Sequence, residues 1–408
     1  MQVFVFADWL ELPEPTLVGT LNVDRIKGKE HFRFAYDKSW LNQVAQQIDP
    51  ELHLFHGEQY SAESKNFRVF LDSCPDRWGR LLMKRREAIQ ANREQRKPAM
   101  LGEVDYLLGV HDTSRMGALR FKTNLQGDFL DNQEQFATPP MSSLRELEFA
   151  ANQVEQDKIE SKDYLKWLFM LLAPGSSLGG ARPKASVIDE NNHLWIAKFP
   201  SRYDDYNIGA WEFVTYRLAL LAGIQMSECR IERFSQSFHT FLTKRFDRID
   251  GRRVHFASAL TQLGYYDGDY EASYLELALF LTQQGANTKK DLEQLWRRLV
   301  FNIAISNTDD HLRNHGFLMS DGGWLLSPAY DLNPVPYGQG LHLNITETDN
   351  RLDFDLAFEV AAFFQLTRQQ ANHIYNEVIN SVKQWKDIAT EIGISRSEQE
   401  RIGKAFNF

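Results

Sequence analysis

Cysteine is scarce in this 408-residue chain, which contains only Cys74 and Cys229, so a disulfide framework is excluded. So few cysteines are typical of proteins in a reducing cytoplasm. No apolar run approaches the roughly 20 residues that a membrane-spanning helix needs. The N-terminal sequence MQVFVFADWLELPE carries acidic residues where a secretory signal needs a basic start. These features predict a soluble, cytoplasmic protein with no membrane partner.

Positive charge is not in excess either. The chain has 46 Lys and Arg against 55 Asp and Glu, for a net charge of −9. A surface that binds nucleic acid over its whole area is therefore excluded, and contact with DNA has to be local or made through a partner. Internal repeats and low-complexity tracts are absent from the sequence, and its length favours two or three globular domains.

The chain is organised around a polar loop, 306–314, that follows the apolar run Phe301–Ile305. The loop carries five side chains that can bind or orient a ligand: Asp309, Asp310, His311, Arg313 and Asn314. Asp309 and Asn314 are five residues apart, as are the catalytic Asp and the metal-binding Asn of protein kinases. Phosphoryl transfer needs a carboxylate that orients the attacking hydroxyl and oxygen ligands for Mg²⁺. The alternative is a plain turn, because Asp and Asn also form turns.

A second carboxylate, Asp331, follows a predicted β-hairpin. Asp321-Gly322-Gly323 is a typical hairpin turn, and the strand-like segment WLLS leads into LSPAYDLNP. This order delivers Asp331 shortly after the polar loop, where a second Mg²⁺ ligand is expected.

A glycine-rich segment, GSSLGGARPKAS, occupies residues 175–186. Its glycines allow the backbone to approach a ligand, and its amides can form an anion-binding nest beside Lys184. Alone it is more typical of a plain turn. Lys198 lies in the following strand, 193–199, as an edge-strand charge or as a phosphate-pairing lysine. The order of glycine-rich turn, hairpin and strand lysine favours the phosphate role.

The order of elements predicts an α+β protein with a bilobal, protein-kinase-like fold. We expect a mixed N-terminal subdomain at 1–125, a polar linker at 126–141, a short antiparallel-sheet lobe at 142–246 and a large helical lobe at 247–408. A nucleotide would bind in the cleft between the lobes. A basic helical run at 77–96 is either a docking face for nucleic acid or a partner, or a solvated surface.

Several motifs resemble the HipA family of toxin serine/threonine kinases, over nearly the whole chain. The N-terminal ones are VGTL, DSCPDRWGR and GALRF; the later ones are SSLGGARPK, KRFDR, NTDDHLRN and YDLNP, in the family's order. The resemblance implies a fold distantly related to eukaryotic protein and lipid kinases.

The resemblance also implies roles for individual residues. Asp309 resembles the catalytic base, Asn314 and Asp331 the Mg²⁺ ligands, and Lys244–Phe246 the hinge that holds adenine. The implied nucleotide-binding residues are Gly179, Gly180, Ala181, Arg182, Pro183, Lys184, Lys198, Lys244, Arg245, Phe246, His311, Leu312, Arg313, Asn314, Tyr330 and Asp331.

Family members autophosphorylate a serine in the glycine-rich loop, which silences the enzyme. Ser177 stands at the matching position and Ser176 beside it is a second candidate. The resemblance further implies a HipB-like helix-turn-helix antitoxin as partner, with DNA contacted only through that antitoxin. It also implies a protein substrate, expected to be an aminoacyl-tRNA synthetase.

The sequence therefore predicts an ATP- and Mg²⁺-dependent protein serine/threonine kinase that arrests growth. Two alternatives stay open. One is a non-catalytic, nucleotide-binding corepressor of the antitoxin, which would have no need of the intact set Lys198, Asp309, Asn314 and Asp331. The other is a small-molecule kinase, which would share the catalytic residues and differ only in its acceptor groove.

Overall fold

The structure is a computed structural model of the whole chain. It describes residues 1–408 except 63–64, 134–136, 157–163, 173–181, 235–237 and 270. The chain forms two compact units, each built from discontinuous segments. Unit 1 comprises residues 1–202 and 247–257, and unit 2 comprises residues 203–246 and 258–408.

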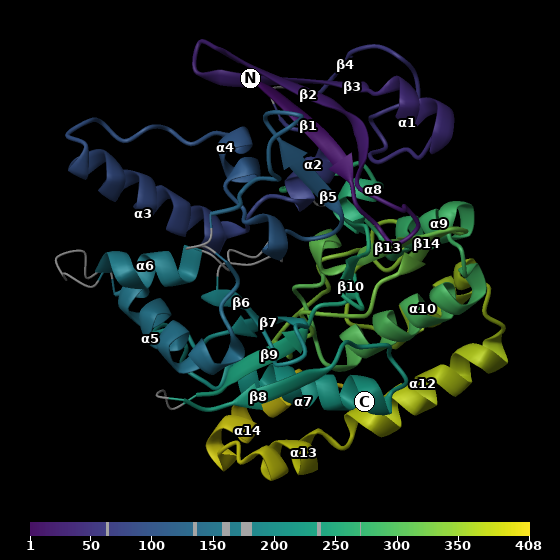
Figure 1. Cartoon of the computed structure of the whole chain (residues 1–408). Coiled ribbons are helices and arrows are strands. Elements are labelled where there is room, and N and C mark those ends of the chain that lie inside the picture. Colours follow the sequence, from purple (N-terminus) through teal and green to yellow (C-terminus); the bar gives the residue numbers. More distant parts are fainter. Residues whose placement is uncertain (63–64, 134–136, 157–163, 173–181, 235–237, 270) are drawn as a thin grey trace. The chain divides into compact units, whose positions relative to one another are not determined.

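Unit 1 contains a five-stranded antiparallel sheet with the strand order β4-β3-β2-β1-β5 (Figure 1). Its strands are β1 (Gln2–Ala7), β2 (Thr16–Ile26), β3 (Lys29–Tyr36), β4 (Gln59–Tyr60) and β5 (Leu119–Lys122). Alternate side chains of β1 are buried, as its alternating sequence predicts. The aromatic rings of Phe34, Phe67, Phe70 and Phe121 pack together beneath the sheet, with neighbouring centroids 5.7–6.4 Å apart.

Helices and two small hairpins complete unit 1. They are α1 (Lys38–Gln43), α2 (Arg68–Asp72), α3 (Arg77–Arg93), α4 (Glu103–Leu108), α5 (Leu144–Glu155), α6 (Tyr164–Leu172), β6 (Lys184–Ile188) with β7 (Leu194–Lys198), and β10 (Arg248–Ile249) with β11 (Arg252–Arg253). Short 3₁₀ turns span Asp112–Ser114 and Met141–Ser143. Strand β12 (Phe256–Ser258) ends where unit 2 resumes.

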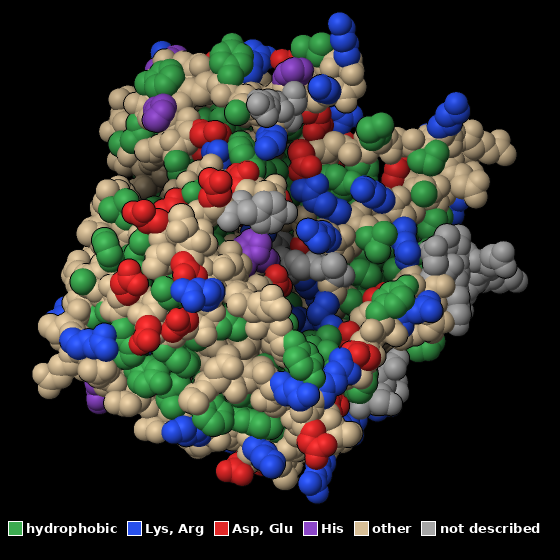
Figure 2. Space-filling model, turned by 180° about the vertical axis from the view of Figure 1, so that it is seen from behind, with side chains coloured by type: hydrophobic (Ala, Val, Ile, Leu, Met, Phe, Trp, Pro, Cys, Tyr) green, Lys and Arg blue, Asp and Glu red, His purple; other side chains and the backbone are tan. Residues whose placement is uncertain are grey.

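The basic helix α3 uses several of its arginines inside unit 1. Arg80 makes two hydrogen bonds of 2.7 Å to the carboxylate of Glu103. Arg85 donates to the backbone oxygen of Val154 and to the hydroxyl of Tyr164, 3.0 Å away. On the face drawn in Figure 2, acidic and basic side chains are interspersed. Part of the charge that the sequence offers as a docking face therefore holds this unit together.

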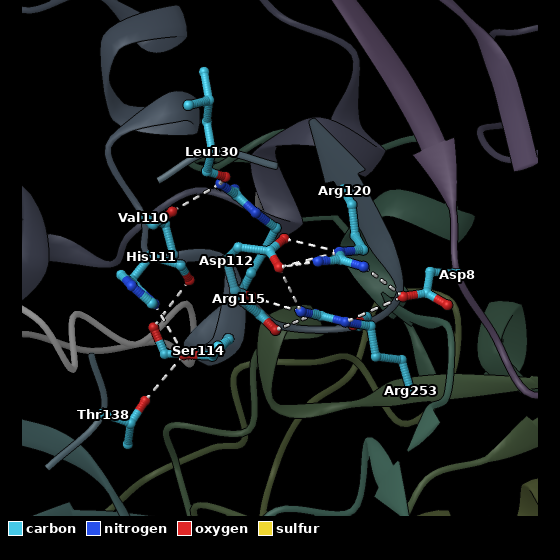
Figure 3. Close-up of polar contacts among 12 residues, drawn as sticks. Asp8, Val110, His111, Asp112, Ser114, Arg115, Arg120, Leu130, Thr138 and Arg253 are labelled. Carbon is cyan, nitrogen blue, oxygen red and sulfur yellow. Dashed lines mark hydrogen bonds and ion pairs between the residues drawn. The ribbon is translucent and has the colours of Figure 1, made fainter. Parts of the chain in front are cut away.

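A network of arginines and carboxylates in unit 1 includes the buried residues Asp112, Arg115 and Arg253 (Figure 3). Arg120 binds Asp112 and also Asp8, whose carboxylate is 2.9 Å away. Arg253 donates to the backbone oxygen of Asp112 at 2.6 Å and to its carboxylate at 3.3 Å. Arg115 is fully buried and donates to four backbone oxygens, those of Ser73, Leu107, Val110 and Leu130, at 2.8–3.0 Å.

The same network joins two of the motifs that carry the family resemblance. The amide of Gly117, in GALRF, donates to the buried carboxylate of Asp247, in KRFDR, at 2.7 Å. Arg248, also in KRFDR, donates to the backbone oxygen of Arg115 at 2.8 Å. Gly117 has φ +71, and a Cβ there would meet the backbone nitrogen of Phe256 at 3.2 Å. The second half of KRFDR is thus structural, and the glycine is required by its conformation.

Unit 2 is mainly helical. Its helices are α7 (Ile208–Leu221), α8 (Ala259–Gln262), α9 (Tyr274–Gln284), α10 (Thr288–Ala304), α11 (Phe354–Val360), α12 (Arg368–Val382), α13 (Trp385–Ile392) and α14 (Arg396–Ile402). Its strands are β8 (Cys229–Glu232) paired with β9 (Thr240–Lys244), and β13 (Gly316–Ser320) paired with β14 (Gly323–Leu326); 3₁₀ turns span Leu312–Asn314, Ala361–Phe364 and Gly403–Ala405. The hairpin turn predicted at residues 321–323 is confirmed. In the described part of the chain, no helix has the length and apolarity needed to cross a membrane.

Helix α10 forms the centre of unit 2. Almost every residue from Asp291 to Ala304 is buried, and α9 and α12 pack against the helix (Figure 1). Its apolar C-terminal half leads directly into the polar loop 306–314. The core of unit 2 therefore fixes the place where the candidate site begins.

Candidate active site

The polar loop leaves α10 at a firmly held helix end. The backbone amide of Asn407 donates to the oxygen of Ala304 at 2.7 Å, and its side chain donates to the oxygen of Ile303 at 3.1 Å. The same side chain donates to the hydroxyl of Ser306 at 2.8 Å. Ser306 has the left-handed backbone angle φ +49, which turns the chain out of the helix. The last turn of α10 is thus capped by a residue about a hundred positions further along the chain.

Asp309 and Asn314 are in direct contact. The side-chain amide of Asn314 donates to the backbone oxygen of Asp309 at 2.7 Å. The Asp309 side chain is 77% exposed, whereas Asn314 is 9% exposed. Because the two heteroatoms of a carboxamide point in opposite directions, this bond turns Oδ1 of Asn314 away from the Asp309 carbonyl. The loop therefore presents a solvated carboxylate and an oriented amide oxygen.

Asp331 lies on a segment that is bound to the same loop. The hydroxyl of Tyr330 donates to the backbone oxygen of Arg313 at 2.8 Å. The amide of Asn333 donates to the side-chain oxygen of Asn307 at 3.4 Å. Asp331 itself is half-buried and has φ +56. Left-handed backbone at residues other than glycine carries strain, and such residues cluster at functional sites.

Two other predicted nucleotide-binding residues meet in unit 2. The ring of Phe246, just after β9, lies 5.6 Å from the ring of Tyr330, with an interplanar angle of 32°. Lys244 ends β9, and its amide donates to the oxygen of Glu228 at 2.8 Å, while Arg245 is buried. The predicted hinge is thus placed beside the segment that carries Asp331.

The histidines of this region lie close to Asp309. Nε2 of His311 is 3.9 Å from Oδ1 of Asp309, and the rings of His311 and His342 are 5.8 Å apart and nearly perpendicular. The pKa of His342 is lowered by burial and by His311, against the opposing effect of Asp309. Arg313 forms an ion pair with Asp267 at 2.6 Å, and Leu312 is buried.

In unit 1, the β6–β7 hairpin places Lys184 directly opposite Lys198. The carboxylate of Asp189 stabilises its turn by accepting from the amides of Asn191 and His193 and from the indole of Trp195, at 2.8–3.0 Å. Burial and these hydrogen bonds act in opposite directions, and the pKa of Asp189 is lowered to about 2. The carboxylate therefore stays ionised, and the turn fixes the register of the two lysines.

Lys184 has a partner that sequence reasoning did not foresee. Its Nζ lies 2.8 Å from Oδ2 of Asp76, and both side chains are 3% exposed. Asp76 also caps α3 by accepting from the amide of Gly79 at 2.8 Å. The predicted nucleotide role of Lys184 therefore stays a prediction, while its anchoring role in unit 1 is a finding. Lys198 is half-buried.

The remaining predicted residues divide into two groups. Arg182 donates to the backbone oxygen of Phe199 at 3.1 Å, and Pro183 is buried beside it. Ser176, Ser177, Gly179, Gly180 and Ala181 lie outside the described residues. The phosphate-loop and autophosphorylation assignments are therefore untested predictions.

The side chains in unit 2 fit a magnesium site by their chemistry. Asn314 and Asp331 offer amide and carboxylate oxygens, which are the hard ligands that Mg²⁺ prefers. The hydrogen bond of Asn314 Nδ2 to the Asp309 carbonyl leaves Oδ1 of Asn314 available as such a ligand. Among the described residues, no group of three or more His, Cys, Asp or Glu side chains is arranged to hold a metal ion. A metal here would need further ligands from a bound nucleotide or water.

Comparison with known proteins gives the family. Residues 176–386, just over half of the chain, match the HipA-like C-terminal domain, and the chain belongs to this family. A chain in the crystal structure of the HipA–HipB–operator DNA complex of Shewanella oneidensis MR-1 matches with a TM-score of 0.65 and 19% identity, over 99% of this chain and 94% of that one. The predicted α+β, kinase-like fold is thereby confirmed.

Two curated relatives match over a smaller share of the chain. "Putative kinase Y4dM" of Sinorhizobium fredii is 27% identical over 212 residues, which cover 48% of this chain and 49% of that protein. The serine/threonine-protein kinase toxin HipA of Shewanella oneidensis is 23% identical over 221 residues, covering 47% and 51%. The chain spans about half the length of the curated relatives it matches.

Proposed function

We propose that this protein is an ATP- and Mg²⁺-dependent protein serine/threonine kinase of the HipA type. The observation that carries the proposal is the joint placement of Asp309, Asn314 and Asp331 in unit 2. Asn314 is bonded to the Asp309 backbone, and the Asp331 segment is bonded to the same loop. The names of the curated relatives support the same reaction class.

In this proposal Asp309 accepts the proton of the substrate hydroxyl and orients it for attack on the γ-phosphorus. Its exposed carboxylate is accessible to a protein acceptor. Asn314 and Asp331 hold Mg²⁺, which when bound offsets negative charge on the phosphate oxygens. Lys198 pairs with the nucleotide phosphates, and Phe246 with Tyr330 borders the adenine. Catalysis comes from positioning and charge neutralisation.

Autophosphorylation at Ser177, or at Ser176, would switch the enzyme off. A phosphoserine adds about −1.5 to −2 charges at neutral pH. If the glycine-rich loop stayed in place, those charges would repel the ATP phosphates. If it moved away, the loop's amides would be lost to the nucleotide. Either route lowers the affinity for ATP.

The proposed partners follow from the family. The solved complex of the Shewanella protein contains HipB and operator DNA, so we propose a HipB-like antitoxin for this chain, with DNA contacted through it. The proposed substrate is a protein serine, expected to belong to an aminoacyl-tRNA synthetase. Phosphorylation of that serine would stall translation and arrest growth in the cytoplasm.

Labelled ATP, Mg²⁺ and a cell lysate, followed by mapping of phosphorylated sites, test this proposal. We expect a labelled serine in a protein of the lysate, and a phosphate on Ser177 or Ser176 of the kinase itself. Both labels should disappear with Asp309→Asn. A labelled metabolite would replace the proposal with a small-molecule kinase. Tight ATP binding without any transfer would favour the nucleotide-binding corepressor.

A further inference from the structure

A second aspartate, Asp310, lies directly after the candidate base and is buried, with 1% exposure. Its Oδ2 accepts a hydrogen bond of 2.7 Å from the hydroxyl of Tyr274, a fully buried residue of α9. That hydroxyl accepts from the side-chain amide of Asn302 in α10 at 2.9 Å. The side-chain oxygen of Asn302 in turn accepts from the side-chain amide of Asn307 at 3.1 Å. We call these four side chains the Asp310 network.

The other oxygen of Asp310 binds a distant segment of the chain. Oδ1 accepts from the backbone amides of His342 and Leu343, at 2.7 and 3.4 Å. This segment is also held by α9, because the amide of Tyr274 donates to the oxygen of Asn344 at 2.9 Å. Asp310 therefore joins the polar loop, helix α9 and the segment 342–344 through one carboxylate.

The position of this segment matters for the candidate base. The ring of His342 lies 5.8 Å from the ring of His311, and His311 lies 3.9 Å from the carboxylate of Asp309. Asp310 thus binds the backbone of His342, whose ring neighbours that of His311, next to the candidate base Asp309. It is itself too buried to touch a substrate. In the part of the chain that the structure describes, Asp310 accepts from neutral donors, and these offset only part of the cost of burying a carboxylate.

We propose that Asp310 is a positioning residue for phosphoryl transfer, which fixes the backbone of Asp309 and holds His342 beside it. The inference rests on the proposed function and deepens it. Loss of Asp310 should misplace the base relative to the acceptor hydroxyl and leave Lys198, Phe246 and Asp331, which lie on other segments, in place. Small misplacements of a catalytic group lower the rate by up to about a hundredfold.

The test compares Asp310→Asn with a matched control, Asp291→Asn. Asp291 is also a buried aspartate of unit 2, and it accepts a backbone hydrogen bond of 3.0 Å from Leu326 in β14. For Asp310→Asn we expect kcat to fall about tenfold to a hundredfold, with KM for ATP within about twofold of the wild type. For Asp291→Asn we expect a loss of thermal stability comparable with that of Asp310→Asn, and a kcat within about twofold of the wild type.

Hydrogen exchange supplies a readout that does not depend on catalysis. The amides of His342 and Leu343 should exchange faster in Asp310→Asn and at the wild-type rate in Asp291→Asn. Tyr274→Phe keeps the bond from Asp310 to His342, and should lower kcat by a smaller factor. If Asp310→Asn does not fold, Tyr274→Phe decides the question through the same kcat measurement.

An Asp310→Asn protein with kcat within about twofold of the wild type would overturn the inference. So would equal losses of kcat in Asp310→Asn and Asp291→Asn, because that result indicates general destabilisation. A wild-type protein without transfer activity would instead refute the proposed function. The exchange rates at His342 and Leu343 would then still show whether Asp310 holds this segment, and unchanged rates would refute it.

Discussion

The two units each contain a buried aspartate in a polar network, and the pKa values of the two aspartates are shifted in opposite directions. In unit 1, Asp112 is surrounded by the arginines Arg120 and Arg253 (Figure 3). Burial would raise its pKa, but these ion pairs prevail and the pKa of Asp112 is lowered. In unit 2, Asp310 accepts from neutral donors, the hydroxyl of Tyr274 and backbone amides such as those of His342 and Leu343, and burial raises its pKa to about 7.

This difference distinguishes a structural network in unit 1 from a network beside the candidate active site in unit 2. A carboxylate that is neutralised by arginines is fixed in one charge state and holds the backbone of unit 1 together. Asp310, a carboxylate held by neutral donors, has a pKa near neutral pH and can be protonated or ionised there. It lies next to Asp309, the proposed catalytic base. Changes in the first network should therefore alter stability, and changes near the second should alter activity.

The largest expected effect is on activity and comes from unit 2. Asp331→Asn should lower kcat by about a thousandfold or more, because a Mg²⁺ ligand is lost where charge develops on the phosphates. It should also weaken Mg²⁺–ATP binding more than Asp309→Asn does. The thermal stability should change little, since asparagine also tolerates the left-handed backbone of this position. Steady-state kinetics and calorimetric titration measure these effects, and near-normal activity would remove Asp331 from the site.

The next effect is on stability and comes from unit 1. Arg115→Met should lower the free energy of unfolding by about 3–5 kcal/mol, because four buried backbone oxygens lose their donor. The control is Arg96→Met, which removes an exposed arginine paired with Glu87 and should leave stability nearly unchanged. Urea denaturation of both variants gives the comparison. Equal stability of the two would mean that the unit 1 network is not a scaffold.

Lys184 and Lys198 lie side by side in the sheet and should separate the two kinds of effect. Lys198→Ala should weaken ATP binding about tenfold, since a phosphate-directed charge is lost. Lys184→Ala should also weaken ATP binding, by a smaller factor. It should mainly lower the melting temperature, because it breaks a buried ion pair with Asp76. Calorimetry with ATP and thermal melting measure both variants, and an unchanged dissociation constant for Lys198→Ala would return it to a plain strand lysine.

The smallest effect is on the pH dependence of stability, and it has opposite signs in the two units. Asp310 has a folded-state pKa near 7, above its ordinary 3.8, so its contribution to stability decreases as pH rises between these values. Asp112 has a lowered pKa, so its contribution is present above pH 3.8 and is lost as pH falls through the folded-state value.

Melting curves between pH 3 and pH 8 test this contrast. Relative to the wild type, Asp310→Asn should gain stability as pH rises from about 4 to about 7. Asp112→Asn should be less stable than the wild type at neutral pH, and this difference should disappear only at the acidic end of the range. A pH-independent difference between the wild type and Asp310→Asn would show that Asp310 does not titrate with an altered pKa.

Much of the local structure could be predicted because its signals are local. Strand β1 spans Gln2–Ala7, and the alternation of its sequence is a local signal for a strand that is buried on one face. The turn at residues 321–323 follows from its glycines. The five-residue spacing from Asp309 to Asn314 correctly indicated two side chains on one loop, and the structure adds their hydrogen bond.

The long-range contacts could not be predicted, because nothing near them in the sequence signals the partner. Lys184 meets Asp76 from 108 positions away, so a lysine expected at a ligand also anchors the sheet. Helix α10 ends at Ala304, where the distant Asn407 caps it. Asp309 and Asp310 are identical neighbours, yet one is exposed and the other buried. The direction of each side chain depends on α9 and on the segment 342–344.

The most direct test of the account is the transfer of phosphate from Mg²⁺–ATP to protein serine, measured for the wild type, Asp309→Asn and Asp112→Asn. We predict transfer by the wild type, a loss of about a thousandfold or more in Asp309→Asn at unchanged melting temperature, and a lower melting temperature with near-normal transfer in Asp112→Asn. Transfer by Asp309→Asn at the wild-type rate would contradict both the assigned base and the division between scaffold and site.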